Sequence, residues 1–170
     1  MKEKTRKKLL GVIYFLIKFS LLAIPLYLLI FVNFSIPSLQ NLVAYLSYSI
    51  LKTVGIQTKL NQSLLTVVSG FKISVIEISM DCTGWKSAYA LLALAIATPA
   101  IKIRKKIKFL LVSLPLLFLI NILRIVTVIY LSLILGPEYF GLVHDLFWQW
   151  GLVVAVLSIW VIWLKYEKRI

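Results

Sequence analysis

Three side chains that could take part in catalysis stand out in this sequence of 170 residues: the only cysteine, the only histidine and one arginine within an apolar run. Cys82 lies in a short polar run, Arg124 follows Leu123 in an apolar segment, and His144 precedes an aromatic segment. A thiolate is a nucleophile, and an imidazole with an ordinary pKa of about 6.5 can exchange protons with it. The pattern indicates cysteine chemistry, although a lone cysteine is often only a small buried hydrophobic residue.

The segments that must position these residues are unusually apolar. Hydrophobic residues make up 61% of the chain and charged residues 15%, against about 45–50% and about 25% in soluble proteins. This composition excludes a soluble or disordered chain. Apolar runs long enough to cross a bilayer as helices predict an all-α integral membrane protein with one membrane domain over residues 1–170. The four expected spans are 9–34, 83–100, 107–135 and 145–164.

Most of the net charge of +13 comes from basic clusters at 2–8, 102–108 and 165–169, and Lys18 and Arg124 within the expected spans add +2. With both termini in the cytoplasm, all three clusters fall inside, where 13 basic residues face Glu3 and Glu167 for a net charge of +11. The outer side then carries four basic and four acidic residues, with a net charge of 0. The charge therefore predicts a multi-pass protein of the cell membrane that meets anionic membrane lipids, not a nucleic-acid-binding protein.

The segment 37–82 is expected on the outer side. Apolar residues at helical spacing predict an amphipathic helix over 38–54 that lies on the membrane surface, with a short span as the alternative. Residues 64–68 and 71–80 are rich in β-branched side chains and flank Ser69-Gly70, which predicts a β-hairpin just before Cys82. The alternation slips after Val75, which indicates a bulge.

This topology brings the three candidates to the outer face. Cys82 would begin the second span, where free N–H groups of a first helical turn lower a thiol pKa and hold an oxyanion. Arg124 would lie in the outer third of the third span with Asn121 on the same helical face, which indicates a polar cavity; snorkelling to the headgroups is the alternative. His144 would open the fourth span as a general base, or serve as an ordinary interfacial residue.

Other site classes find little support. One cysteine and one histidine exclude a multi-Cys or His-rich metal centre, and no organic cofactor is implied. A non-catalytic membrane adaptor or assembly protein, with Arg124 pairing with a partner helix, remains an alternative. A small channel or transporter is disfavoured because no inverted halves are visible.

The motifs DCTGWKS at 81–87 and NILR at 121–124, followed by His144, resemble the exosortase/archaeosortase family. The resemblance runs from about residue 71 to 151. Many members have more spans before the cysteine, whereas one is expected here. A third-position histidine is nearer the bacterial pattern and Cys-Thr-Gly is common on the archaeal side, so the source stays open.

The resemblance implies a membrane cysteine transpeptidase or protease that acts on secreted surface proteins. Their C-terminal sorting signals carry a short motif, a transmembrane helix and a basic tail, and a lipid or amine acceptor receives the cleaved protein. Cys82 would be the nucleophile and Arg124 and His144 its partners. Thr83, Gly84 and Asn121 would support the site or its oxyanion.

Overall fold

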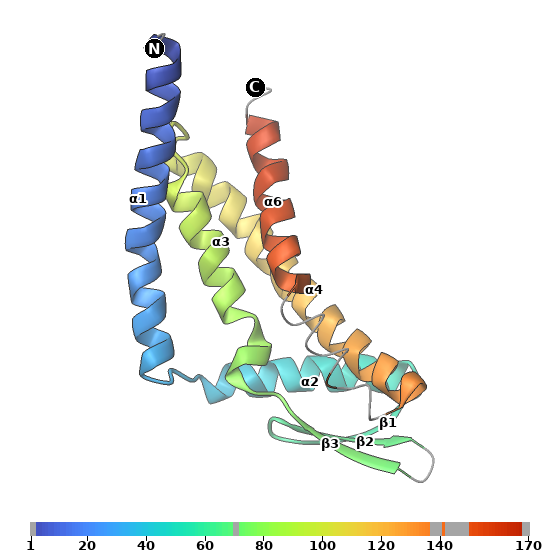
Figure 1. Ribbon diagram of the computed structural model, residues 1–170. Coiled ribbons are helices and arrows are strands. Elements are labelled where there is room, and N and C mark those ends of the chain that lie inside the picture. The colour runs from blue at the N-terminus through green and yellow to red at the C-terminus, as the bar shows by residue number, and fades with distance from the viewer. Residues whose placement is uncertain (1–2, 70–71, 137–140, 142–149, 168–170) are drawn as a thin grey trace. The chain divides into compact units, whose positions relative to one another are not determined.

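The computed structural model describes residues 3–69, 72–136, 141 and 150–167. Figure 1 shows a mainly helical chain with one small sheet. The elements in chain order are α1 (Glu3–Phe31), α2 (Pro37–Thr53), β1 (Gln57–Asn61), β2 (Leu64–Ser69), β3 (Lys72–Glu77), the 3-10 turn η1 (Met80–Thr83), α3 (Trp85–Ala97), α4 (Ile103–Leu135) and α6 (Leu152–Glu167).

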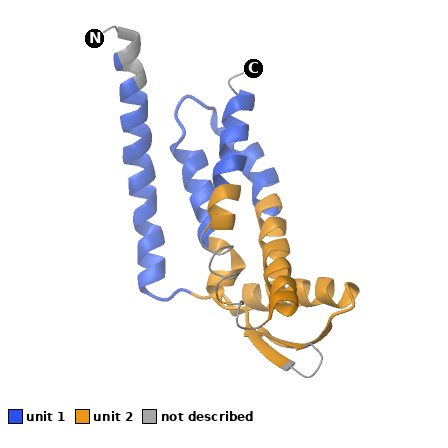
Figure 2. Cartoon of the chain, turned by 45° about the vertical axis from the view of Figure 1, so that its right-hand side comes forward, with its two compact units in different colours: residues 1–34, 86–115, 156–170 blue, residues 35–85, 116–155 orange. Residues whose placement is uncertain are grey.

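The chain divides into two compact units, which are coloured separately in Figure 2. Unit 1 comprises residues 1–34, 86–115 and 156–170, and therefore contains α1, nearly all of α3, the start of α4 and most of α6. Unit 2 comprises residues 35–85 and 116–155, and contains α2, the sheet, η1 and the rest of α4. Each unit is described by itself below.

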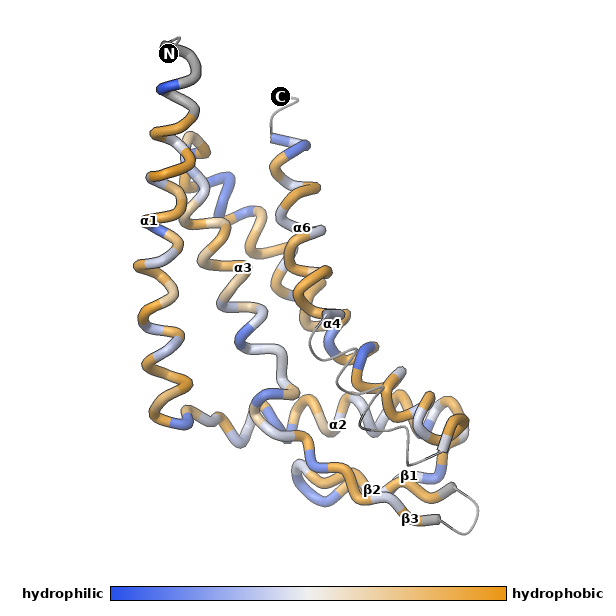
Figure 3. The backbone as a smooth tube through the Cα atoms, in the orientation of Figure 1, coloured by the Kyte–Doolittle hydropathy of each residue, from blue (hydrophilic) through white to orange (hydrophobic). Residues whose placement is uncertain are grey.

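Two helices in the described part of the chain are long and apolar enough to cross a membrane: Leu9–Phe31 within α1, and α4. At 1.5 Å per residue, the 33 residues of α4 extend for about 50 Å, well beyond a hydrocarbon core of about 30 Å. Figure 3 shows that both helices are apolar along most of their length. The first and third expected spans thus correspond to membrane-capable helices, with α1 ending at Phe31 rather than at residue 34.

The second expected span, 83–100, is shorter in the structure than the sequence indicates. Gly84 adopts a left-handed backbone with φ +76°, so the α-helix begins only at Trp85. It ends at Ala97, before Pro99, and Ala100 is again left-handed with φ +63°. The resulting 13 residues extend for about 20 Å, less than the about 30 Å of a bilayer core. The fourth expected span corresponds to α6, which has 16 described residues.

Polar contacts gather in unit 1 where α3 connects to α4. The buried ammonium of Lys106 donates to the carbonyl oxygens of Ile96 and Thr98 at 2.7 and 2.6 Å. These carbonyls lie at the C-terminal end of α3, where C=O groups without a helical partner favour a nearby cation. The Tyr89 hydroxyl donates to the Leu22 carbonyl at 2.8 Å and so ties α3 to α1.

Unit 2 contains a three-stranded antiparallel sheet in the order β1-β2-β3. The expected hairpin is confirmed as β2 and β3, but β1 was not anticipated. Its sequence, QTKLN, alternates without a strongly apolar face, and it turns into β2 through Gln62 with φ +54°. The expected bulge is wrong. The β2–β3 ladder keeps an unbroken register from Ser69–Lys72 to Leu64–Glu77, so the slip lies within β3, where Ile73 and Val75 are exposed and Ile76 packs against the core.

Helix α2 confirms the helix expected over 38–54 and packs against the sheet in unit 2. Its buried residues are Val43, Ala44, Ser47 and Leu51, whereas the apolar side chains of Leu42 and Val54 are exposed. The core joins this face to Leu65 and Val67 of β2 and to three isoleucines of α4, Ile122, Ile125 and Ile129. This core fixes η1, which follows β3 after two residues, against the same part of α4 that carries Asn121.

Candidate functional site around Cys82

Cys82 lies in η1, in a tight turn between the sheet and α3. Its backbone N–H donates to the Ser79 carbonyl at 3.0 Å, and its side chain is half-buried. The expectation that Cys82 occupies the first turn of a long helix is therefore wrong in detail, because Gly84 separates η1 from α3. The Cys82 N–H is already used and does not add to a free set of helix N-terminal donors.

Ser79 is the nearest polar neighbour of the thiol within its own turn. The Ser79 hydroxyl oxygen lies 3.5 Å from the Cys82 sulfur, and either group can donate. Sequence reasoning missed this residue because it read 71–80 as one apolar strand. The signal was present, since Ser79 precedes Cys82 by three residues, the spacing at which side chains meet across one turn of a 3-10 helix.

Asn121 of α4 holds the η1 backbone in place. Its amide nitrogen donates to the Cys82 carbonyl oxygen at 2.9 Å, and the side chain is 1% exposed. A Cβ atom on Gly84 would lie 3.0 Å from the Asn121 Cγ, so both the left-handed backbone and the close approach require glycine there. The Asn121 Oδ1 is buried and has no hydrogen-bond partner among the described residues. The site therefore contains an unused acceptor next to the turn that carries the thiol.

Arg124 lies one turn further along α4 and is 9% exposed. Its guanidinium and the Cys82 thiol lie close enough to interact electrostatically. The side-chain stem runs past the segment that enters α6, where a Cβ on Gly151 would lie 4.0 Å from the Arg124 Cδ. Leu123, by contrast, is 57% exposed. The expected shared face of Asn121 and Arg124 is thus confirmed and points into unit 2, which favours the polar-cavity interpretation over snorkelling.

The remaining predicted residues are Thr83 and His144. The Thr83 hydroxyl donates to the Met80 carbonyl at 2.7 Å and is buried, so it stabilises η1 rather than facing the thiol. His144 lies outside the described residues, and its role stays a prediction. Within the described ranges, no group of three or more His, Cys, Asp or Glu side chains could hold a metal ion.

The order of these parts along the chain corresponds to a known family. A family model described as transmembrane exosortase (Exosortase_EpsH) matches residues 6–164. The chain belongs to the transmembrane exosortase family. No curated protein and no solved structure gave a match.

Family membership agrees with the resemblance drawn from Cys82, the Asn121–Arg124 motif and His144, and it extends the match almost to both ends of the chain. Together with the two membrane-capable helices, it indicates that the chain is a membrane protein. The family name suggests a transpeptidase role in the membrane. The structure adds a geometric relation between the lone thiol, a buried amide and a buried guanidinium.

Proposed function

We propose that this exosortase is a membrane-embedded cysteine transpeptidase that cleaves the C-terminal sorting signal of secreted surface proteins and transfers them to an acceptor. One observation carries the proposal. Arg124 is buried within electrostatic range of the only thiol, and Asn121, one turn before it, binds the carbonyl of that same cysteine. Burying a guanidinium is costly unless a specific partner or charge uses it. A positive charge held there would stabilise a thiolate or a developing oxyanion in the same turn.

The reaction would proceed through a thioester. Attack of the Cys82 sulfur on the scissile carbonyl carbon forms the S–C bond, and collapse of the tetrahedral intermediate then breaks the C–N bond and leaves a thioester. The proton taken from the thiol, which we assign to His144, passes to the leaving amine. Attack by an amine or lipid acceptor on the thioester then releases Cys82 and completes transfer, whereas attack by water would give hydrolysis.

Arg124 is the proposed donor to the developing oxyanion. The Cys82 N–H is engaged with Ser79, so a donor from elsewhere is needed. A guanidinium held in a buried site meets this need without reorganising during the reaction. Asn121 has a positioning role, because its hydrogen bond to the Cys82 carbonyl and its contact with Gly84 fix the turn that presents the thiol.

The proposed arrangement in the membrane has four spans, with both termini in the cytoplasm and Cys82 at the outer face. Substrate would approach as a transmembrane helix whose basic tail remains on the cytoplasmic side, placing its recognition motif at the outer interface. α3 is too short to cross a bilayer of about 30 Å alone, so the turn and the residues that follow Ala97 would complete that passage.

The direct test uses a secreted reporter fused to a C-terminal motif, helix and basic tail from the same secretome. Cys82→Ala should abolish cleavage while the protein remains folded and in the membrane. Cys82→Ser should be nearly inactive, because a hydroxyl is a far weaker nucleophile than a thiolate. Cleavage at the wild-type rate by Cys82→Ala would reject the proposal and leave the adaptor alternative.

The orientation has a separate test, because Cys82 is the only thiol in the chain. A membrane-impermeant maleimide applied to intact cells should label it. A cysteine introduced at exposed Arg104 in the Cys82→Ala background provides the matched control, and should be labelled only in inverted vesicles. The reverse pattern of labelling would contradict the topology.

His144 is tested through pH. His144→Ala should slow the reaction at neutral pH. Raising the pH toward the ordinary cysteine pKa of about 8.5 should restore part of the rate, because more thiolate then forms without a base. A rate that stays equally depressed at every pH would remove His144 as the base.

A further inference from the structure

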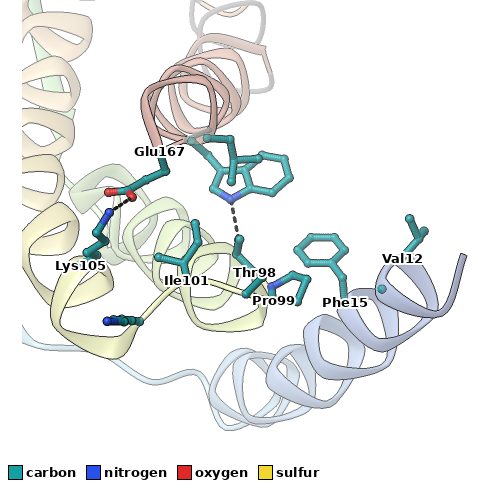
Figure 4. A pocket seen from close by; sticks show the side chains of 12 residues that line it. Val12, Phe15, Thr98, Pro99, Ile101, Lys105 and Glu167 are labelled. Carbon is teal, nitrogen blue, oxygen red and sulfur yellow. Dashed lines mark hydrogen bonds and ion pairs between the residues drawn. The ribbon is translucent and has the colours of Figure 1, made fainter. Parts of the chain in front are cut away.

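Unit 1 contains a cavity that the proposed reaction does not use. It encloses about 890 Å³, in the range of about 300–1,000 Å³ typical of ligand pockets. Figure 4 shows that Val12 and Phe15 of α1, the connection from Thr98 to Ile101, and Glu167 of α6 surround it. The lining comprises Gly11, Val12, Phe15, Thr98, Pro99, Ala100, Ile101, Lys102, Lys105, Trp160, Leu164 and Glu167.

The walls of this cavity are apolar and ordered. The rings of Phe15 and Trp160 stack with centroids 5.7 Å apart and an interplanar angle of 19°. The indole N–H of Trp160 donates to the Thr98 hydroxyl at 3.0 Å, and that hydroxyl donates to the Leu94 carbonyl. These bonds satisfy the polar atoms of the Trp160 and Thr98 side chains, so this part of the wall offers a ligand mainly hydrocarbon and suits an acyl chain.

The charged residues that line the cavity are two lysines and one glutamate. Lys105 forms an ion pair with Glu167 at 2.6 Å, and the Glu167 side chain is only 12% exposed, so its charge is neutralised within the protein. Lys102 also lines the cavity, is exposed, and makes no ion pair within the ranges that the structure describes. An apolar cavity with an ammonium in its lining that is unpaired among the described residues matches a ligand with a hydrocarbon tail and an anionic head.

We propose that this cavity binds one anionic phospholipid, with the phosphate at Lys102 and an acyl chain along Phe15 and Trp160. Basic pockets between membrane helices at the end that carries the positive clusters are recurrent sites for anionic lipids. A free phosphate gains nothing from the hydrocarbon walls. A basic substrate tail would be repelled by Lys102 and by the neighbouring cluster at 102–108. The proposal does not depend on the chemistry of Cys82.

The test is native mass spectrometry of the full-length protein in neutral detergent, titrated with phosphatidylglycerol or with phosphatidylcholine of the same acyl chains. The wild type should retain one phosphatidylglycerol saturably, with at least a tenfold preference over phosphatidylcholine. Lys102→Gln should weaken retention about fivefold, the effect of about one basic residue on an anionic headgroup. Gly11→Leu places a side chain where nothing lies within 4 Å of the Cβ, and should block the acyl chain.

Lys108→Gln is the matched control, because it removes the same charge from the same cluster but does not line the cavity. It should retain phosphatidylglycerol like the wild type. Equal weakening by Lys102→Gln and Lys108→Gln would reduce the effect to diffuse electrostatics and overturn the site. Equal retention of phosphatidylcholine, unchanged retention by Gly11→Leu, or complete displacement by millimolar inorganic phosphate would each overturn it as well.

Discussion

In unit 1 the buried ammonium of Lys106 donates to two backbone carbonyls, whereas in unit 2 the buried amide of Asn121 donates once and leaves its oxygen without a partner among the described residues. The Lys106 hydrogen bonds satisfy backbone carbonyls at the C-terminal end of α3. Asn121, by contrast, lies one helical turn from the buried Arg124 and contacts the turn that carries Cys82, the only cysteine. A buried polar group thus satisfies a helix end in unit 1, whereas in unit 2 a buried amide keeps an unused acceptor beside the cysteine turn.

The two units also differ in how much of their helices is buried. α1 of unit 1 has no buried residue in its apolar window, which suits a helix that faces lipid. In unit 2, α2 and β2 together with part of α4 form a closed core. A rigid core beneath η1 can hold a thiol, an amide and a guanidinium in fixed geometry, which a catalytic site requires. Substitutions in the two units should therefore separate turnover from stability.

The largest effect is expected for Arg124→Lys. Lysine keeps the charge but loses the planar fork of donors, and loss of an oxyanion contact lowers turnover by about 10²–10³. Arg104→Lys makes the same chemical change at an exposed position of unit 1 and should leave turnover unchanged. Cleavage of the reporter by both variants, at matched protein levels, checks this difference. Wild-type activity in Arg124→Lys would return Arg124 to a snorkelling or adaptor role.

The next largest effect is expected for Gly84→Ala. A left-handed alanine costs about 1–2 kcal/mol, and the contact with Asn121 adds about 1–3 kcal/mol of overpacking. Gly55→Ala is the matched control, since its φ is +85° but nothing lies within 4 Å of a Cβ there. Thermal midpoints in detergent and reporter turnover should both fall further in Gly84→Ala. Equal losses in the two variants would mean that the Asn121 contact is unimportant.

The smallest effect on turnover is expected for Lys106→Met in unit 1, which should change stability alone. It removes two charge-assisted hydrogen bonds, each worth about 1.5–3 kcal/mol, from the end of α3. The thermal midpoint should fall by several degrees, while turnover well below that temperature should match the wild type. Lys108→Met, at an exposed position nearby, should change neither quantity. A selective loss of turnover in Lys106→Met would break the division between the units.

Sequence reasoning anticipated the parts of the molecule that depend on composition. The apolar lengths that became α1 and α4, the helix α2 and the β2–β3 hairpin follow from hydropathy and periodicity, and the shared face of Asn121 and Arg124 follows from their spacing. Backbone geometry was less accessible. The left-handed Gly84 that ends η1, and the use of the Cys82 N–H by Ser79, depend on how the turn packs against α4. β1 was missed because its pairing with β2, not its own pattern, creates the strand.

The central claim is that Cys82 forms a covalent bond with the substrate. An acid-quenched reaction of the wild-type exosortase with the reporter, followed by intact-mass spectrometry, should contain enzyme carrying the reporter fragment on the N-terminal side of the cut. Neutral hydroxylamine should release that fragment as a hydroxamate, because thioesters react with this amine, and Cys82→Ala should form no adduct. Cleavage without a hydroxylamine-sensitive adduct, or an adduct that persists in Cys82→Ala, would contradict the account.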